Sequence, residues 1–158
     1  MDPQERNKLI NQYKDGYRVV AEALAGATDE ELDARPAPAK WTAREIVHHL
    51  ADSEMTAAVR FRLLLAEDKP VIKSYDQDRF AGRLHYERPH EASLELFRSA
   101  RAATAELMGC LTEADWLREG THSEMGRFGM DTWLRVYAPH AHRHADQIRL
   151  ARKAAVKK

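Results

Sequence analysis

The sequence predicts an all-α protein, a four-helix bundle with a long crossover connection that forms one domain over residues 1–158. Three observations support this fold class. The chain has only seven glycines and six prolines, and β-branched residues seldom follow one another. Apolar residues recur at intervals of three and four over four long segments, which is the period of an amphipathic helix. No internal repeat divides the chain, and its length suits a single hydrophobic core.

The first helix is predicted to begin after Asp2, an acidic N-cap that Pro3 follows at the first helical position. It is expected to end at Gly26, because glycine commonly terminates helices. Between these ends lies an apolar stripe of Leu9, Tyr13, Tyr17, Val20 and Leu24. Thr28 opens a second capping box, but Pro36 then permits only a short turn.

The second helix has the clearest start signal in the sequence. Thr42 is the predicted N-cap, and Glu45 closes the capping box. Trp41 precedes the cap and is placed to pack on Ile46 as a hydrophobic staple. The helix is expected to run to about Glu67, along an apolar side formed by Ile46, Leu50, Ser53, Ala57, Phe61 and Leu64.

A crossover is predicted between Val71 and Arg88, where the periodicity fades except for a short helix near residues 76–81. A connection of this length lets the second and third helices run parallel. The third helix is predicted to begin at Pro89, with a stripe of Leu94, Phe97, Ala100, Thr104, Leu107 and Leu111. Thr112 resembles another helix start, and residues 120–130, with three glycines, predict a loop or a short extended segment.

The fourth helix is predicted to be capped by Asp131 or Thr132. One side of it carries Trp133, Tyr137, His140, His144, Ile148 and Ala151. Pro139 lies inside this segment and removes a backbone donor. It predicts either a later helix start or a kink that aims His140 at a binding site.

Histidine is the feature of the composition that most needs an explanation, because the chain contains eight. With Ile46 as the centre of the apolar side, His49 lies at about −60° and His48 at about 200°. His48 is therefore expected to face solvent or a subunit contact, and His49 to border the interior. His140 and His144 lie one helical turn apart on the apolar stripe, whereas His142 is expected to point to water.

A histidine pair one turn apart brings two imidazoles to one cation, and a third from a facing helix completes a three-nitrogen set. Burying three neutral imidazoles without a common partner costs free energy, which coordination of a cation removes. The sequence therefore predicts a metal site formed by His49, His140 and His144, with packed core histidines as the alternative. His85, His90 and His122 lie in connections or at a helix start and are not predicted ligands.

No catalytic or cofactor-binding residue is assigned from the sequence. The polar residues nearest the predicted ligands along the chain, Glu45, Asp52, Asp76 and Gln147, are typical of caps and solvated helix faces.

Charge and cysteine content exclude several classes of protein. Lys plus Arg and Asp plus Glu number 25 each, so no net field attracts nucleic acid or an anionic membrane. The basic end, residues 149–158, is expected to place cations at the end of the last helix. The single cysteine, Cys110, excludes an intramolecular disulfide and sites with several thiolates, and it is expected to be a small buried hydrophobe.

Neither a membrane span nor a signal peptide is predicted, since no apolar run approaches about 18 residues and the first residues lack charged and apolar regions. We therefore expect a cytoplasmic protein. The partner that we expect for it is a small-molecule substrate.

Residues 41–54, 60–63 and 72–76 closely resemble the YfiT branch of the DinB-like metalloenzymes, and residues 137–148 resemble the last helix of that branch. The resemblance covers nearly the whole chain. Carried over position by position, it puts the metal ligands of the family on His49, His140 and His144. The chain differs from the family at Pro139, where relatives commonly have an aromatic residue, and at Arg143, where they often have a histidine adjacent to His144.

This resemblance implies a four-helix bundle with a long crossover, one divalent metal ion per chain and a homodimer. The metal it implies is zinc, with nickel in some preparations. The activity it implies is metal-dependent hydrolysis, or a transferase reaction that uses bacillithiol, mycothiol or glutathione as a thiol co-substrate. The sequence alone does not decide between this enzyme, a non-catalytic metal-binding module and a helical bundle without metal.

Overall fold

The computed structural model describes residues 1–155 and confirms the four-helix bundle. Three of its long helices are α1 (Pro3–Leu24), α3 (Ala43–Ala66) and α5 (Glu91–Met108), and the fourth consists of two pieces, α7 (Met130–Tyr137) and α8 (His140–Arg152). The short elements are α2 (Asp29–Asp33), α4 (Gln77–Arg83), α6 (Glu113–Trp116), β1 (Val71–Ile72), β2 (Glu119–His122) and β3 (Gly126–Gly129).

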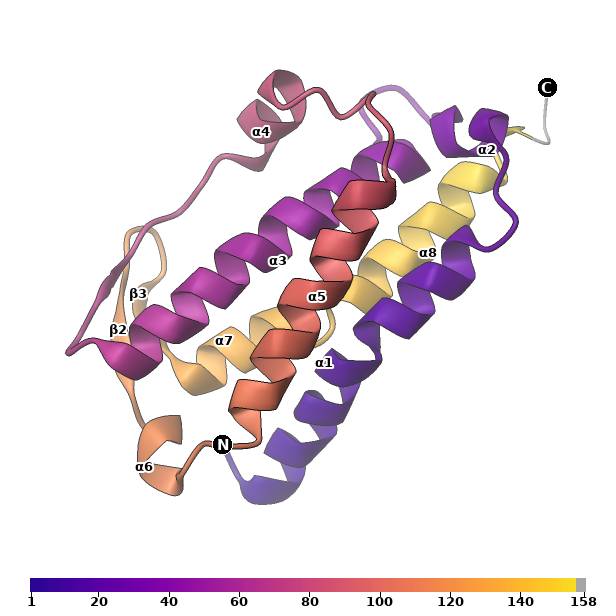
Figure 1. Ribbon diagram of the computed structural model, residues 1–158. Coiled ribbons are helices and arrows are strands. Elements are labelled where there is room, and N and C mark those ends of the chain that lie inside the picture. Colours follow the sequence, from indigo (N-terminus) through magenta and orange to yellow (C-terminus); the bar gives the residue numbers. More distant parts are fainter. Residues whose placement is uncertain (156–158) are drawn as a thin grey trace.

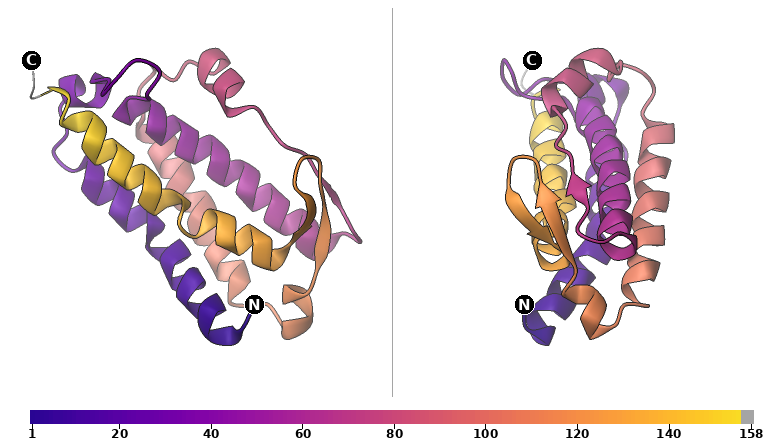
Figure 2. Two further views of the ribbon diagram at one scale, coloured as in Figure 1. Left: turned by 180° about the vertical axis from the view of Figure 1, so that it is seen from behind. Right: turned by 90° about the vertical axis from the view of Figure 1, so that its left-hand side faces the viewer.

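The helices α3 and α5 run in the same direction, and α1 and the α7–α8 pair run the opposite way (Figure 1). The crossover that contains β1 and α4 makes this topology feasible, because it carries the chain back along the bundle before α5 begins (Figure 2). The predicted parallel arrangement of the second and third helices is therefore confirmed. Within residues 1–155, none of the helices is both long enough and apolar enough to span a membrane.

The helix starts follow the capping signals of the sequence. The side chain of Asp2 accepts a hydrogen bond from the Glu5 amide, and Thr42 and Glu45 form a reciprocal capping box. The boxes that open at Thr28 and Thr112 are also present. Each cap satisfies backbone amides that would otherwise lack a partner in the first turn.

The glycine-rich segment after α6 folds into a small sheet in the order β1-β2-β3, with β1 parallel to β2 and β2 antiparallel to β3. Val71 pairs with Thr121, and Glu119 pairs with Gly129. Gly120 is required here because a Cβ atom would lie 2.3 Å from the carbonyl oxygen of Pro70. The sheet thus fastens the start of the crossover to the hairpin that leads into α7.

A buried ion pair joins three helices near the middle of the bundle. The Arg101 guanidinium donates to Oε2 of Glu54 at 2.6 Å and to the Tyr13 carbonyl at 2.7 Å. Tyr13 also hydrogen-bonds Oε1 of Glu54. Arg101 has room for this contact only because Gly16 has no side chain, since a Cβ atom there would lie 2.2 Å from Nη1 of Arg101. The network fixes the register of α1, α3 and α5.

Three sequence predictions about local structure need correction. The third helix begins at Glu91 with His90 as N-cap, two residues after the predicted start at Pro89. The cap of α7 is Gly129 instead of Asp131 or Thr132. Cys110 is exposed, not buried, because α5 ends at Met108 and the chain turns away at Gly109.

Candidate metal centre

Three histidines from two helices converge at one end of the bundle. His49 comes from α3, and His140 and His144 come from the first two turns of α8. Nε2 of His140 lies 3.4 Å from Nε2 of His49 and 3.1 Å from Nε2 of His144. The three ligand atoms lie within 4.8 Å of one another. The structure therefore brings together the three residues that the sequence selected.

The two Nε2 separations to His140 fit a single transition-metal ion. At a metal-to-nitrogen distance of about 2.05 Å, two ligands are about 3.3 Å apart in a tetrahedral site and about 2.9 Å apart at adjacent corners of an octahedron. The separation of 3.1 Å lies between these values, and that of 3.4 Å lies close to the tetrahedral one. Three imidazole nitrogens also suit zinc, nickel and other borderline cations better than calcium or magnesium.

Neighbouring side chains orient two of the imidazoles. Nδ1 of His144 lies 2.7 Å from Oε1 of Gln147, and this amide oxygen accepts only if Nδ1 carries the proton. The lone pair of Nε2 is then directed at the other histidines. The indole of Trp41 packs on His49 with ring centroids 4.7 Å apart. Nδ1 of His49 is buried without a hydrogen-bond partner among the described residues.

The electrostatics keep all three imidazoles neutral at pH 7. Burial lowers the pKa of His49 to about 3, and the nearby His144 adds to this effect. Burial also lowers the pKa of His144 to about 4 and holds the pKa of His140 well below its usual range. Neutral imidazoles have the free lone pair that a metal ligand needs.

The prediction that His48 faces solvent or a subunit contact is wrong. His48 is fully buried, with Nδ1 at 2.8 Å from Oγ of Ser93 and Nε2 at 3.0 Å from the Arg88 carbonyl. The prediction assumed that α3 buries one side, whereas 16 of its 24 residues are buried. The crossover and the start of α5 cover the side that was expected to be solvated.

The last helix also differs in part from the prediction. Its two pieces meet at Ala138 and Pro139, so Pro139 marks a later helix start, one of the two expected outcomes. His142 is half-buried and donates from Nε2 to the Gln12 carbonyl at 3.0 Å, so its predicted exposure to water is wrong. This contact helps to hold α8 against α1.

Of the four polar residues near the ligands in sequence, only Gln147 contacts a histidine of the cluster. Glu45 and Asp76 are engaged in helix caps. Asp52 accepts a hydrogen bond from the Tyr86 hydroxyl at 2.7 Å. The last contact fixes the far end of the crossover to α3.

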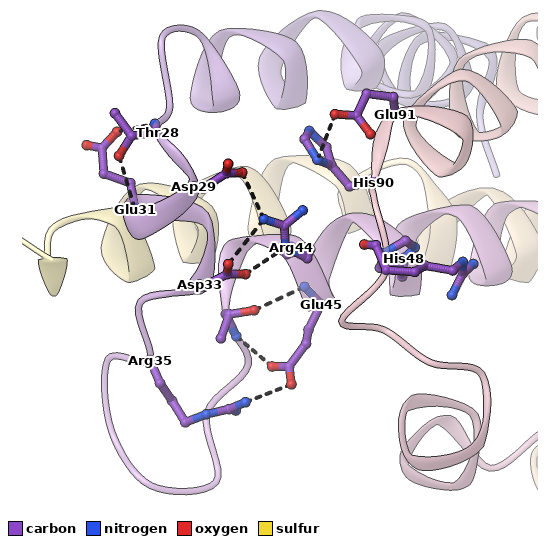
Figure 3. Close-up of polar contacts among 12 residues, drawn as sticks. Thr28, Asp29, Glu31, Asp33, Arg35, Arg44, Glu45, His48, His90 and Glu91 are labelled. Atoms are coloured by element: carbon purple, nitrogen blue, oxygen red, sulfur yellow. Dashed lines mark hydrogen bonds and ion pairs between the residues drawn. The ribbon is translucent and has the colours of Figure 1, made fainter.

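The linker between α2 and α3 lies beside the cluster, since its Trp41 packs on His49. Arginines hold α2 and this linker against the start of α3 (Figure 3). Arg44 reaches back to Asp33 at 2.6 Å and to Asp29 at 3.1 Å. Arg35 pairs with Glu45 at 2.7 Å and also donates to the Lys40 carbonyl. The backbone next to Trp41 is therefore fixed by contacts at both ends of the linker.

A cavity of about 510 Å³ opens onto His144, a size that suits a small organic ligand. Its walls come from the linker, from Ile46 of α3, from the first turn of α4 and from α8. Trp41 and Gln147, which contact His49 and His144, also line it. Sequence reasoning missed this cavity, because its walls come from segments without a shared local pattern.

Comparisons with known proteins agree with this fold and this site. Residues 12–148 match the family model of the DinB superfamily. A protein of Oceanobacillus iheyensis, named "Putative metal-dependent hydrolase OB0782", is 33% identical over 142 residues, which cover 90% of this chain and 83% of that protein. A protein of Geobacillus thermodenitrificans with the same descriptive name is 33% identical over 157 residues, 96% of this chain and 85% of its own length.

The solved structure of YfiT from Bacillus subtilis superposes with a TM-score of 0.88 at 28% sequence identity, over 97% of this chain and 89% of that one. It is described as "a probable metal-dependent hydrolase with an unusual four-helix bundle topology". Both the helix order and the sequence therefore connect the two proteins. Together with the family-model match, these similarities establish that the chain belongs to the DinB superfamily.

Proposed function

We propose that this protein is a metal-dependent enzyme in which His49, His140 and His144 hold one divalent cation, zinc or nickel. The names of the relatives support metal dependence and hydrolysis. The convergence of the Nε2 atoms of three neutral imidazoles supports the ligand set.

One observation carries the choice of an enzyme over a metal-binding module. The cluster contains three histidines, and within residues 1–155 no cysteine, aspartate or glutamate joins it as a fourth ligand. The cavity reaches the cluster at His144. A structural zinc site closes its coordination sphere with four protein ligands, whereas a catalytic site leaves a position for water or substrate.

A bound divalent cation lowers the pKa of a coordinated water or thiol, and so supplies a nucleophile near neutral pH. The protein contributes the geometry of the site. Gln147 holds the proton on Nδ1 of His144, and Trp41 restricts the ring of His49. The neutral histidines add no negative charge, so the cation keeps its full charge for polarising a substrate.

The reaction is either hydrolysis or transfer of a low-molecular-weight thiol, since both use a nucleophile activated in this way. We assign the substrate to small molecules because of the size of the cavity. A screen should compare ester and amide hydrolysis with conjugation of bacillithiol, mycothiol or glutathione to a chromogenic electrophile. Dependence on the added thiol would identify a transferase.

The same screen tests metal dependence. We expect a chelator to abolish turnover, and zinc or nickel to restore it. His49→Gln should be inactive, whereas His142→Gln, which changes a histidine on the α1 side of α8, should retain activity. Turnover that survives complete metal removal would exclude the mechanism. Stoichiometric metal without turnover on any of these substrates would favour the non-catalytic module.

Two further expectations from the sequence belong to this proposal, namely a homodimer and a cytoplasmic location. Exposed Met55 and Val59, one turn apart on α3, supply apolar surface that suits a subunit contact. Sedimentation equilibrium of the metal-loaded protein tests the homodimer directly. A monomer at micromolar concentration would contradict it.

A further inference from the structure

We infer that the cavity beside the three histidines selects substrates with an apolar group, aryl or branched alkyl, adjacent to the atom that binds the metal. This inference rests on the proposed function, because it takes the metal position as the site of reaction. It adds the class of substrate and names Trp41 and Leu150 as residues that determine specificity.

The lining of the cavity is the first argument. Six of its eleven lining residues are apolar, namely Pro36, Ala37, Ala39, Trp41, Ile46 and Leu150. The charged lining residues are Lys40 and Asp78, which have opposite signs. Their charges offset each other, so the cavity offers no net attraction for a polyanion such as a nucleotide. Apolar contact is therefore the main source of selectivity.

The position of Trp41 is the second argument. Its indole contacts the His49 ring and also faces the cavity, so the apolar wall begins directly at a predicted metal ligand. A substrate group bonded to the reacting centre would therefore meet this wall first. Arg35 and the capping box at Thr42 hold the backbone on both sides of Trp41, so the wall is formed before substrate binds.

Leu150 is the third argument. It is 60% exposed on α8, about 200° around the helix from the core residue Ile148. Core packing does not account for it, but it lines the same cavity as Trp41. An apolar group bound there would remove surface of both side chains from water.

The opposite wall differs from this one. Gln77 and Asp78 belong to α4, a helix in which no residue is buried. Figure 1 shows α4 outside the bundle, joined to it by extended segments. The fixed wall that carries Trp41 is therefore better suited to select an apolar group than the polar wall of α4.

The test uses zinc-loaded protein and two probes that chelate divalent cations through the same atoms, acetohydroxamate and benzohydroxamate. They differ only in a methyl or a phenyl group beside the chelating atoms. Titration calorimetry measures both affinities, and the ratio of the two cancels any change in the metal itself. We expect benzohydroxamate to bind about tenfold more tightly, because burying about 50 Å² of phenyl surface has this effect.

Two variants and a matched control localise the effect. Trp41→Ala should bring the affinity ratio close to one, and Leu150→Gln should lower it by about threefold. Leu117→Gln should leave the ratio unchanged, because Leu117 is an equally apolar residue, 81% exposed, beside α6 at the other end of the bundle. Because Leu150 and Leu117 are both exposed, neither substitution should disturb folding.

Each outcome has a distinct meaning. A ratio near one in the unsubstituted protein, or a high ratio that neither Trp41→Ala nor Leu150→Gln lowers, would overturn this inference while the proposed metal site stands. Failure of acetohydroxamate to bind the zinc-loaded protein would instead contradict the open coordination position, and this inference with it.

Discussion

The adjacent histidines of α3, His48 and His49, show how two buried imidazoles differ when the protein supplies hydrogen-bond partners for both ring nitrogens of only one of them. Both nitrogens of His48 have partners, Ser93 on one side and the Arg88 carbonyl on the other. Among residues 1–155, Nδ1 of His49 has no partner, and its Nε2 meets only another imidazole nitrogen. Buried polar atoms are almost always hydrogen-bonded in native proteins. His49 is therefore the one whose Nε2 is available to a ligand from outside the chain.

The difference follows from what covers each side of α3. The crossover and the first turn of α5 cover His48 and supply backbone and hydroxyl groups. The side that carries His49 faces α8, which supplies His140 and His144. Burial alone thus does not identify a metal ligand, whereas burial together with a ring nitrogen that faces only other imidazoles does. The following predictions test this distinction.

The largest effect is expected for metal affinity. His49→Gln should weaken zinc binding by about 10²–10³-fold, because the roughly 10–16 kcal/mol of a four-ligand zinc site is shared among its ligands. His48→Gln should change the affinity no more than a few-fold. Alanine at His140 or His144 should behave like His49→Gln. Competition titrations with a chromogenic chelator measure all four variants, and equal losses at His48 and His49 would remove the distinction between them.

A smaller loss of zinc affinity is expected when Gln147 is substituted. Gln147→Leu removes the acceptor for Nδ1 of His144 and should cost about 10–100-fold in zinc affinity. Gln147→Glu keeps an acceptor at this place and should retain most of the affinity. If leucine and glutamate had the same effect, the contact with His144 would not orient the ligand.

Acidification should destabilise the metal-free protein. The pKa of His49 is about 3 in the folded state, below its unfolded value, so the unfolded state binds more protons as the pH falls below about 6.5. At pH 5 this linkage should cost about 2 kcal/mol for His49, and the stability should be fully present above about pH 6.5. Urea unfolding at pH 5 and pH 7 measures it. His49→Gln should flatten this pH dependence, and an unchanged slope would contradict the assignment.

The smallest effect is the stability cost of His48→Gln at pH 7 in the metal-free protein. Glutamine can keep one of the two hydrogen bonds of His48, so the loss should be about 1 kcal/mol. At this pH His49→Gln should cost less, because His49 makes no hydrogen bond to a group that would be left unpaired. A larger loss of stability at His49 than at His48 would contradict this comparison, because it would show that contacts within the protein stabilise the His49 imidazole as well.

Local signals in the sequence predicted most of the helices. Asp2, Thr28 and Thr42 mark real helix starts because a cap satisfies backbone amides within one turn and needs no distant partner. The convergence of His49, His140 and His144 was also predictable, since each lies on the apolar side of its helix. Their role as metal ligands stays a prediction.

The features that the sequence did not predict depend on contacts between distant segments. His48 is buried because the chain returns over it from residues 88–93, and helical periodicity carries no information about that return. The cavity combines the linker, α4 and α8. The exposure of Cys110 depends on where α5 ends. The apolar stripe in the sequence continues to Leu111, so it does not show that the helix ends at Met108.

The central claim is that the chain binds one divalent ion through the three histidines, and elemental analysis tests it most directly. The protein should be purified without a polyhistidine tag, alongside His49→Gln and His48→Gln. We predict close to one equivalent of zinc or nickel per chain in the unsubstituted protein and in His48→Gln, and little in His49→Gln. Metal-free protein that also fails to take up added zinc or nickel, or full occupancy in His49→Gln, would contradict the claim.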